Sequence, residues 1–248
     1  MYQQTLRDCW AKEKGAINAW CSIPSAITAE MMSLNDFDSI TIDMQHGLVD
    51  YQATLNMLQV ISGSGKTPMV RVPWNEPGII MKSLDAGALG IICPMINTPE
   101  DAINFVGATR YAPEGHRSSG PTRALMVHGA NYHEEANDKI ISLAMIETVE
   151  ALENVEKIAA TEGLTGIYVG PSDLSISMGF NPGLDVYDDE PSTSSNPLFS
   201  LDNILLSPHI AGVTQEATIR MSRQAVQNVL DVFDDKVDPE VIINKNVL

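Results

Sequence analysis

The 248-residue sequence is poor in cysteine, in basic residues and in long apolar runs. Its three cysteines, at positions 9, 21 and 93, lack CxxC spacing, which argues against a disulfide framework and a zinc site, so we expect buried or inert thiols. No apolar run reaches about 18 residues, and the first segment has no signal-peptide core, so we expect a cytoplasmic protein. Basic residues number 15 against 32 acidic ones, and the net charge of -17 disfavours binding to nucleic acid or an anionic membrane.

Two nucleotide-binding motifs are also missing. The dinucleotide fingerprint GxGxxG occurs nowhere, and the segment GSGKT at 63–67 has the ending of a P-loop without its first glycine, because position 60 is Val. We therefore interpret residues 63–67 as a turn between a helix and a strand.

The sequence does contain a regular alternation of strand-like and helix-like segments, with 44% hydrophobic residues to fill a core. Strand-like segments lie near residues 17, 39, 68, 89, 140 and 166, and helical patterns cover 25–32, 52–61, 77–86, 99–110 and 150–161. This alternation predicts a parallel sheet, either in a (β/α)8 barrel or in an open doubly wound sheet. Six strands are two fewer than the barrel requires.

One polar stretch, residues 112–138, interrupts the alternation. We expect it to be a long loop, a kind of segment that is often a functional lid or an interface. Its histidines include His128 and His133, whose separation of five residues is poor for a metal pair on a helix. We therefore expect solvated loop histidines.

Charged side chains follow four of the predicted strands: Asp43 with His46, then Arg71, Glu147 and Asp173. Because parallel strands end at one edge of a sheet, we expect these five residues to form one site. Simpler interpretations remain open for each of them taken alone. The two aspartates are also good helix N-caps, a lone histidine is often structural, and the arginine suits a surface ion pair.

The group as a whole suits one chemistry. Glu147 and Asp173 offer oxygen ligands with open positions, as Mg²⁺ or Mn²⁺ prefers. Such a metal polarises the carbonyl of a 2-oxo acid and makes the adjacent carbon acidic. His46 would accept the proton, and Arg71 would stabilise the negative oxygen that develops. The predicted reaction is enolate chemistry on pyruvate-like substrates.

Several ordered motifs in residues 5–182 closely resemble the HpcH/HpaI class II aldolases: FDSITIDMQHGLVDY at 37–51, a long segment at 68–102, RYAPEGHRSSGPTRA at 110–124, MIET at 145–148 and GPSDLSISMG at 170–179. The resemblance implies a (β/α)8 barrel, usually a hexameric homo-oligomer. It also implies cleavage or formation of 2-oxo acids, from an aldehyde and a pyruvate enolate, with Mg²⁺, Mn²⁺ or Co²⁺.

By motif match, His46 corresponds to the family's base and Arg71 to its transition-state stabiliser. Glu147 and Asp173 correspond to its metal ligands. Asp85, in LDAGA, matches the acid that raises the basicity of the histidine.

The match also covers the substrate-binding turn of the family, which here comprises Gly170, Pro171, Ser172 and Asp173. Met145 is a departure, because the best-known members have a substrate-binding Gln at this position.

From residue 183 the sequence changes character and resembles the C-terminal end of the D-isomer-specific 2-hydroxyacid dehydrogenases, through DVYDDEP, NPLFSLDN and SPHIAG. His209 matches their acid/base, but no cofactor fingerprint lies upstream, so we expect His209 to be a relic. We predict two parts: an aldolase-like 1–182 and a tail, 183–248. Strand-like patterns at 204–207 and 241–243, with a helical pattern at 214–233, give the tail enough elements to complete an eight-stranded count.

Three functions follow from these observations, in order of support. The first is a metal-dependent pyruvate aldolase. The second is a chimera whose catalysis is impaired by its altered C-terminus, and the third is a remnant of an NAD-dependent dehydrogenase.

Overall fold

The computed structural model describes residues 5–179, which belong to one compact unit. The strands are β1 (Asn18–Cys21), β2 (Ser39–Asp43), β3 (Thr67–Arg71), β4 (Gly90–Cys93), β5 (Ile141–Ile146) and β6 (Gly166–Val169). The helices are α1 (Thr5–Trp10), α2 (Ala26–Ser33), α3 (Tyr51–Gly63), α4 (Pro77–Asp85), α5 (Pro99–Thr109), α6 (Thr122–His128), α7 (Tyr132–Lys139), α8 (Val149–Glu153), α9 (Val155–Ala159) and α10 (Pro171–Ser177).

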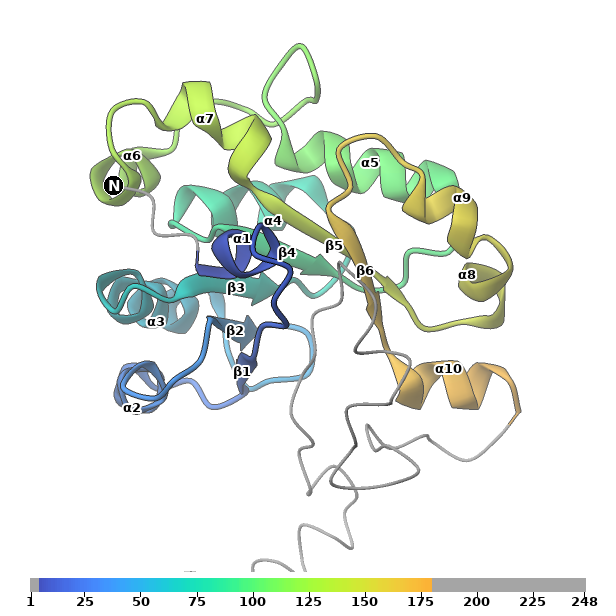
Figure 1. Cartoon of the computed structure of the whole chain (residues 1–248), viewed down its shortest axis with the longest axis horizontal. Helices are drawn as coiled ribbons and strands as arrows, with labels where there is room; N and C mark the ends of the chain where they lie inside the picture. Colours follow the sequence, from blue (N-terminus) through green and yellow to red (C-terminus); the bar gives the residue numbers. More distant parts are fainter. Residues whose placement is uncertain (1–4, 180–248) are drawn as a thin grey trace, which may run out of the picture. The chain divides into compact units, whose positions relative to one another are not determined.

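All six strands are parallel and lie in the order β1-β2-β3-β4-β5-β6, so each pairs with the next in sequence (Figure 1). A doubly wound sheet reverses its direction at a switch point, whereas a β/α barrel advances one strand at a time. Of the two architectures left open by the sequence, the barrel type is therefore confirmed for these six strands.

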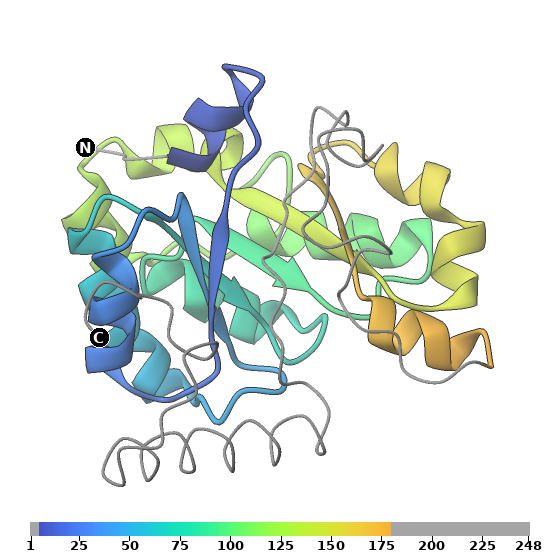
Figure 2. The same cartoon turned by 60° about the horizontal axis from the view of Figure 1, so that its bottom comes forward.

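The sheet is curled, and its concave face brings β1 and β6 toward each other. The ring of Trp20 on β1 lies 5.8 Å from the ring of Tyr168 on β6. The connecting helices cover the convex face (Figure 1), while α1 lies at one end of the strands and α10 at the other (Figure 2). The backbone N–H of Leu6 on α1 donates to the hydroxyl of Thr67, the first residue of β3, at 3.2 Å. Helix α1 thus closes the amino-terminal end of the curl.

Two apolar cores follow from the alternation of side chains along each strand. The larger core fills the space between the sheet and the outer helices and includes Leu58, Leu84 and Phe105. The smaller lies on the concave face and comprises Leu6, Ala16, Met69, Ile92, Ile141, Leu143 and Met145, with Cys9, Trp10, Trp20 and Tyr168 at its margin.

Local signals in the sequence account for where most outer helices begin. Each of five helices follows a residue whose side chain accepts a hydrogen bond from a backbone N–H of the first turn: Ser25, Asp50, Glu76, Thr98 and Thr148. The N-cap at Ser25 and the helix-to-strand turn at 63–67 were both predicted, and both are confirmed.

The prediction of a long loop over 112–138 is wrong, because this stretch contains α6 and α7. Neither helix has a side-chain N-cap hydrogen bond, and they are only 7 and 8 residues long. Tertiary packing therefore holds them, through the buried side chains of Ala124, His128, Tyr132 and Ala136. His128 is only 8% exposed, which also contradicts the prediction of a solvated histidine.

Two smaller differences involve element ends. The helix predicted over 150–161 is two short helices divided at Asn154, whose side-chain amide donates to the carbonyl of Asn97 at 3.1 Å. The fourth strand was predicted over 89–95 but ends at Cys93, so Met95 lies outside it. Among the described residues the three cysteines are free, as expected, and burial raises the pKa of Cys21 to about 11. No helix in this range is long and apolar enough to cross a membrane.

The buried His128 predicts how stability changes with pH. Burial lowers its pKa from 6.5 to about 4, and Arg123 adds to this, although the carbonyl of Gly87 at 3.0 Å acts in the opposite direction. Between pH 6.5 and 4 the unfolded chain binds a proton that the folded chain does not. The free energy of unfolding should therefore fall, by at most about 3 kcal/mol, as the pH is lowered from 6.5 to 4. His128→Gln should flatten this dependence of the free energy of unfolding on pH, measured by urea unfolding at several pH values. An unchanged dependence would contradict the burial argument.

Candidate active site

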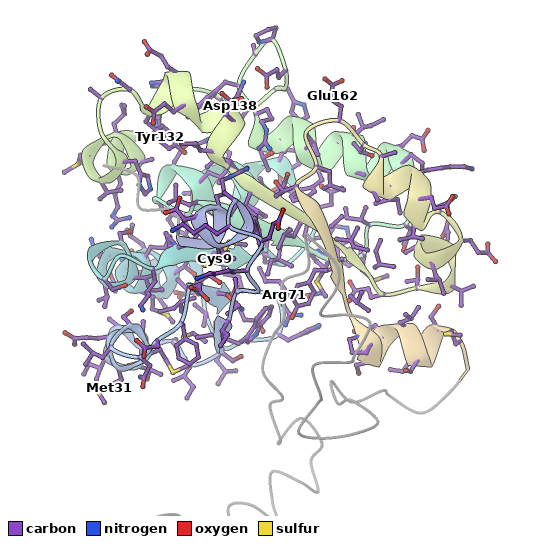
Figure 3. The ribbon with its side chains drawn as sticks, viewed as in Figure 1. Cys9, Met31, Arg71, Tyr132, Asp138 and Glu162 are labelled. Carbon is purple, nitrogen blue, oxygen red and sulfur yellow. The ribbon has the colours of Figure 1, made fainter. Side chains whose placement is uncertain are left out.

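Strand alternation places Asp43, Arg71 and Glu147 on the concave face at the carboxyl ends of their strands. Along β3, Thr67, Met69 and Arg71 share this face, and on β5 the same parity extends from Met145 to Glu147. Asp43 and Arg71 are direct partners in the β2–β3 register. In Figure 3, Arg71 lies in the middle of the fold, whereas Met31, Asp138 and Glu162 lie at its periphery.

Asp43 and Arg71 form a bidentate ion pair. Nε of Arg71 donates to Oδ1 of Asp43 at 2.8 Å, and Nη2 donates to Oδ2 at 2.6 Å. The carboxylate is only 3% exposed and the guanidinium side chain 13% exposed. Arg71 is therefore no surface ion pair, which removes that alternative interpretation.

The Asp43 carboxylate also accepts hydrogen bonds from the turn that directly follows it. Oδ1 accepts the backbone N–H groups of Gln45 at 3.0 Å and His46 at 3.2 Å. This turn does not start a helix, since α3 begins at Tyr51 with Asp50 as its N-cap, so Asp43 is no helix cap. Burial alone raises the pKa of Asp43, but the hydrogen bonds and charge of Arg71 outweigh it and keep this pKa below its ordinary value.

Trp20 is a member of this group that the sequence interpretation missed. Its indole N–H donates to Oδ2 of Asp43 at 3.3 Å, and the guanidinium carbon of Arg71 lies 4.8 Å from its ring centroid. The sequence signal that could have identified Trp20 is its position two residues after Asn18 on β1, because this spacing places both side chains on the concave face.

Glu147 follows β5 and is 2% exposed. Its Oε1 accepts the backbone N–H of Met95 at 2.7 Å. Met95 has a φ of 54°, in the left-handed region that non-glycine residues rarely adopt, and this conformation directs its amide at the carboxylate. Nothing in the sequence predicts a left-handed backbone at this methionine.

The electrostatics of Glu147 identify its neighbours. Burial raises the pKa of Glu147 above its ordinary value, the hydrogen bond from Met95 lowers it, and the charge of Asp173 raises it further. The charges of Arg71 and His46 act in the lowering direction. The structure therefore brings together four of the predicted groups around one edge of the sheet.

Asp173 and the predicted substrate-binding turn lie at the start of α10. Gly170 is the N-cap, Pro171 follows it, and Asp173 stands in the first turn with an exposed side chain, so Asp173 is not the cap itself. A Cβ on Gly170 would lie 2.8 Å from Oε2 of Glu147, which explains why the turn needs glycine here. Ser172 is half-buried in the same turn.

The structure does not bring Asp85 to His46 within one chain. His46 is exposed in the turn after β2. Asp85 ends α4, the helix that returns to the amino-terminal edge, and there Nη2 of the buried Arg117 donates to it at 2.7 Å. Arg117 is held between the rings of Tyr111 and Tyr132, at 4.5 and 5.5 Å from their centroids.

Two further predictions concern the metal site and the C-terminal tail. Residues 5–179 contain no group of three or more His, Cys, Asp or Glu side chains arranged to hold a metal, and the pair of Glu147 and Asp173 as metal ligands stays a prediction. The predicted tail elements at 204–207, 214–233 and 241–243, and His209, lie outside the described residues. The division at 182 stays a prediction.

Comparison with known proteins adds sequence relatives. The family model of the HpcH/HpaI aldolase/citrate lyase proteins matches residues 17–233, past the predicted division. The hydroxypyruvate/pyruvate aldolase of Rhizorhabdus wittichii is 40% identical over 185 residues, 75% of this chain and 74% of that protein. The 5-keto-4-deoxy-D-glucarate aldolase of Citrobacter koseri is 37% identical over 181 residues, 72% of this chain and 70% of that protein.

Solved structures give the same result for the fold. An HpcH/HpaI aldolase/citrate lyase family protein from Burkholderia cenocepacia has a TM-score of 0.72 at 26% identity, with 91% of this chain and 99% of that chain covered. An HpcH/HpaI aldolase from Desulfitobacterium hafniense has a TM-score of 0.65 at 25% identity, with 71% and 70% covered.

The buried ion pair predicts a large difference between two carboxylate truncations. Asp43→Ala leaves the guanidinium of Arg71 without its partner inside the fold, so we expect a loss of about 3 kcal/mol in the free energy of unfolding. Glu135→Ala breaks the half-exposed i,i+4 pair with Lys139 and should cost less than about 1 kcal/mol. Urea unfolding of both variants measures this, and equal losses would contradict the burial argument.

Proposed function

Because the chain belongs to the HpcH/HpaI aldolase/citrate lyase family and is an aldolase, we propose that it makes and breaks the carbon–carbon bond of 2-oxo acids through a pyruvate enolate. The observation that carries this proposal is the environment of Glu147. One buried carboxylate has a second carboxylate, a guanidinium and an imidazole within electrostatic reach. This combination suits deprotonation next to a carbonyl.

The donor set fits a divalent metal. The pKa of Glu147 is raised by burial and then by the like charge of Asp173, so a cation between the two carboxylates would stabilise both ionised forms. The set consists of oxygen atoms, which favours Mg²⁺ or Mn²⁺, with Co²⁺ also consistent with the resemblance. When bound, the metal would polarise the keto group of the substrate.

The side chains of the chain supply the remaining steps. The imidazole of His46 accepts a proton from C3 of pyruvate, and the positive charge of Arg71 stabilises the oxygen on which negative charge develops. The C3 carbon then adds to the carbonyl carbon of an aldehyde, and the new alkoxide takes back the proton from His46. Cleavage is the same sequence reversed. Gly170, Pro171 and Ser172 form the turn that we propose to contact the substrate.

Met145 and Asp85 concern two further questions, the substrate contacts and the basicity of His46. Met145 is 2% exposed, and its apolar side chain beside Gly170 favours contacts with substrate that differ from those of a Gln. Asp85 would raise the basicity of His46 only if another copy of the chain supplied it, which agrees with the predicted homo-oligomer. Sedimentation velocity tests the oligomeric state directly.

Proton exchange at C3 of pyruvate tests the function without knowledge of the aldehyde. In D₂O with Mn²⁺, the wild-type chain should catalyse loss of the pyruvate methyl signal in proton NMR. Glu147→Gln should reduce this rate by at least about 100-fold, because it removes one anionic ligand of a site with only two.

The outcome separates the alternatives. A folded wild-type chain that binds Mn²⁺ in calorimetry and shows no exchange is the impaired chimera. A chain that neither binds Mn²⁺ nor exchanges contradicts the proposal. Glu162→Gln, at an exposed position in the turn that precedes β6 and at the periphery in Figure 3, is the matched carboxylate control and should keep the wild-type exchange rate.

The close packing of Gly170 gives a second prediction. Gly170→Ala places a methyl group against Oε2 and Cβ of Glu147, at 2.8 and 2.9 Å, so the carboxylate must move. We expect Mn²⁺ affinity to fall by about 10-fold to 100-fold. Gly120→Ala adds the same methyl where no atom lies within 4 Å, and it should bind Mn²⁺ as the wild type does. Unchanged affinity in Gly170→Ala would exclude Glu147 as a ligand.

A further inference from the structure

Trp20 contacts both members of the Asp43–Arg71 pair with different parts of one side chain. The edge of the indole donates its N–H to Oδ2 of Asp43 at 3.3 Å, and its face lies 4.8 Å from the guanidinium carbon of Arg71. Trp20 comes from β1, Asp43 from β2 and Arg71 from β3. Three neighbouring strands thus meet in one contact.

The two contacts restrict different motions of the guanidinium. The bidentate pair with Asp43 fixes the Nε and Nη2 edge but permits the guanidinium plane to rotate about that edge. A ring against the face opposes this rotation. The hydrogen bonds of the described residues use Nε and Nη2 of Arg71, so Nη1 is the nitrogen whose direction depends on that plane.

We propose that Trp20 is a positioning residue that sets the plane of the Arg71 guanidinium, and so the direction of the positive charge offered to the substrate oxygen. This inference rests on the proposed function, in which Arg71 stabilises that oxygen. Trp20 itself touches no reacting atom in this account. Its ring also contacts Tyr168 at 5.8 Å, on the strand that precedes the turn with Asp173, so it has a support on the far side of the curl.

Trp10 provides a matched comparison within the same apolar core. Both tryptophans flank the core on the concave face, but Trp10 belongs to α1 at the amino-terminal end. The indole N–H of Trp10 is buried and has no hydrogen-bond partner among the described residues. Trp10 therefore fills space, and its replacement isolates the effect of volume alone.

The kinetic test uses pyruvate C3 proton exchange with saturating Mn²⁺. Trp20→Phe keeps a ring face and loses the N–H donor, and we expect kcat to fall about 10-fold. Trp20→Leu loses the face as well and should fall about 100-fold. The KM for pyruvate and the Mn²⁺ affinity in calorimetry should change less than about twofold, because Glu147 and Asp173 are untouched.

Trp10→Phe should retain the wild-type kcat. Equal kcat values for Trp10→Phe and Trp20→Phe would overturn the proposal, and so would a loss confined to KM or to Mn²⁺ affinity. A graded loss of kcat in the order wild type, Phe, Leu supports it.

A second experiment needs no activity, so failure of the proposed function and failure of this inference can be distinguished. In a Trp10→Phe/Trp74→Phe background, Trp20 is the sole tryptophan of the chain. Arg71→Met should shift its fluorescence emission, because the cation leaves the ring face. Lys82→Met removes a cation that lies 4.4 Å from the ring of Tyr51 and should leave the spectrum unchanged. Identical spectra for both variants, in chains shown by circular dichroism to be folded, would overturn the proposed contact.

Discussion

The ion pair between Asp43 and Arg71 is the interaction on which this site depends, and it is stable only in a particular environment. Two charges removed from water lose hydration, and their attraction compensates only when the remaining hydrogen-bond capacity is filled. Here two backbone amides and the indole of Trp20 fill that capacity on the carboxylate. The register of β2 with β3 sets the two side chains opposite each other, and the curl of the sheet covers them.

Much of this arrangement was visible in the sequence because strands encode direction and parity. A charged residue at the end of an apolar run, repeated at Asp43, Arg71 and Glu147, predicts a polar edge on a parallel sheet. The starts of outer helices were indicated by N-caps such as Ser25, whose side chain accepts a hydrogen bond from a backbone N–H in the first turn of the helix. These signals are local, so each was readable without knowledge of the rest of the chain.

The features that the sequence did not disclose depend on distant contacts. The helices α6 and α7 lack caps and are held by packing, so their polar composition suggested a loop and concealed the buried His128. Asp85 carried a motif but no indication that Arg117, 32 residues later, is its partner. Trp20 resembled an ordinary apolar strand residue, and only its position across the curl shows that it contacts two charges.

The left-handed backbone of Met95 determines when the free-energy cost of ordering the Glu147 side chain is incurred. A non-glycine residue in this conformation raises the energy of the folded chain by on the order of 1 kcal/mol, and surrounding contacts must hold it there. Its amide then orients Glu147 before any substrate arrives. The entropy of ordering that carboxylate is therefore lost during folding and not during binding, so affinity and turnover at this edge are tied to the stability of the loop between β4 and α5.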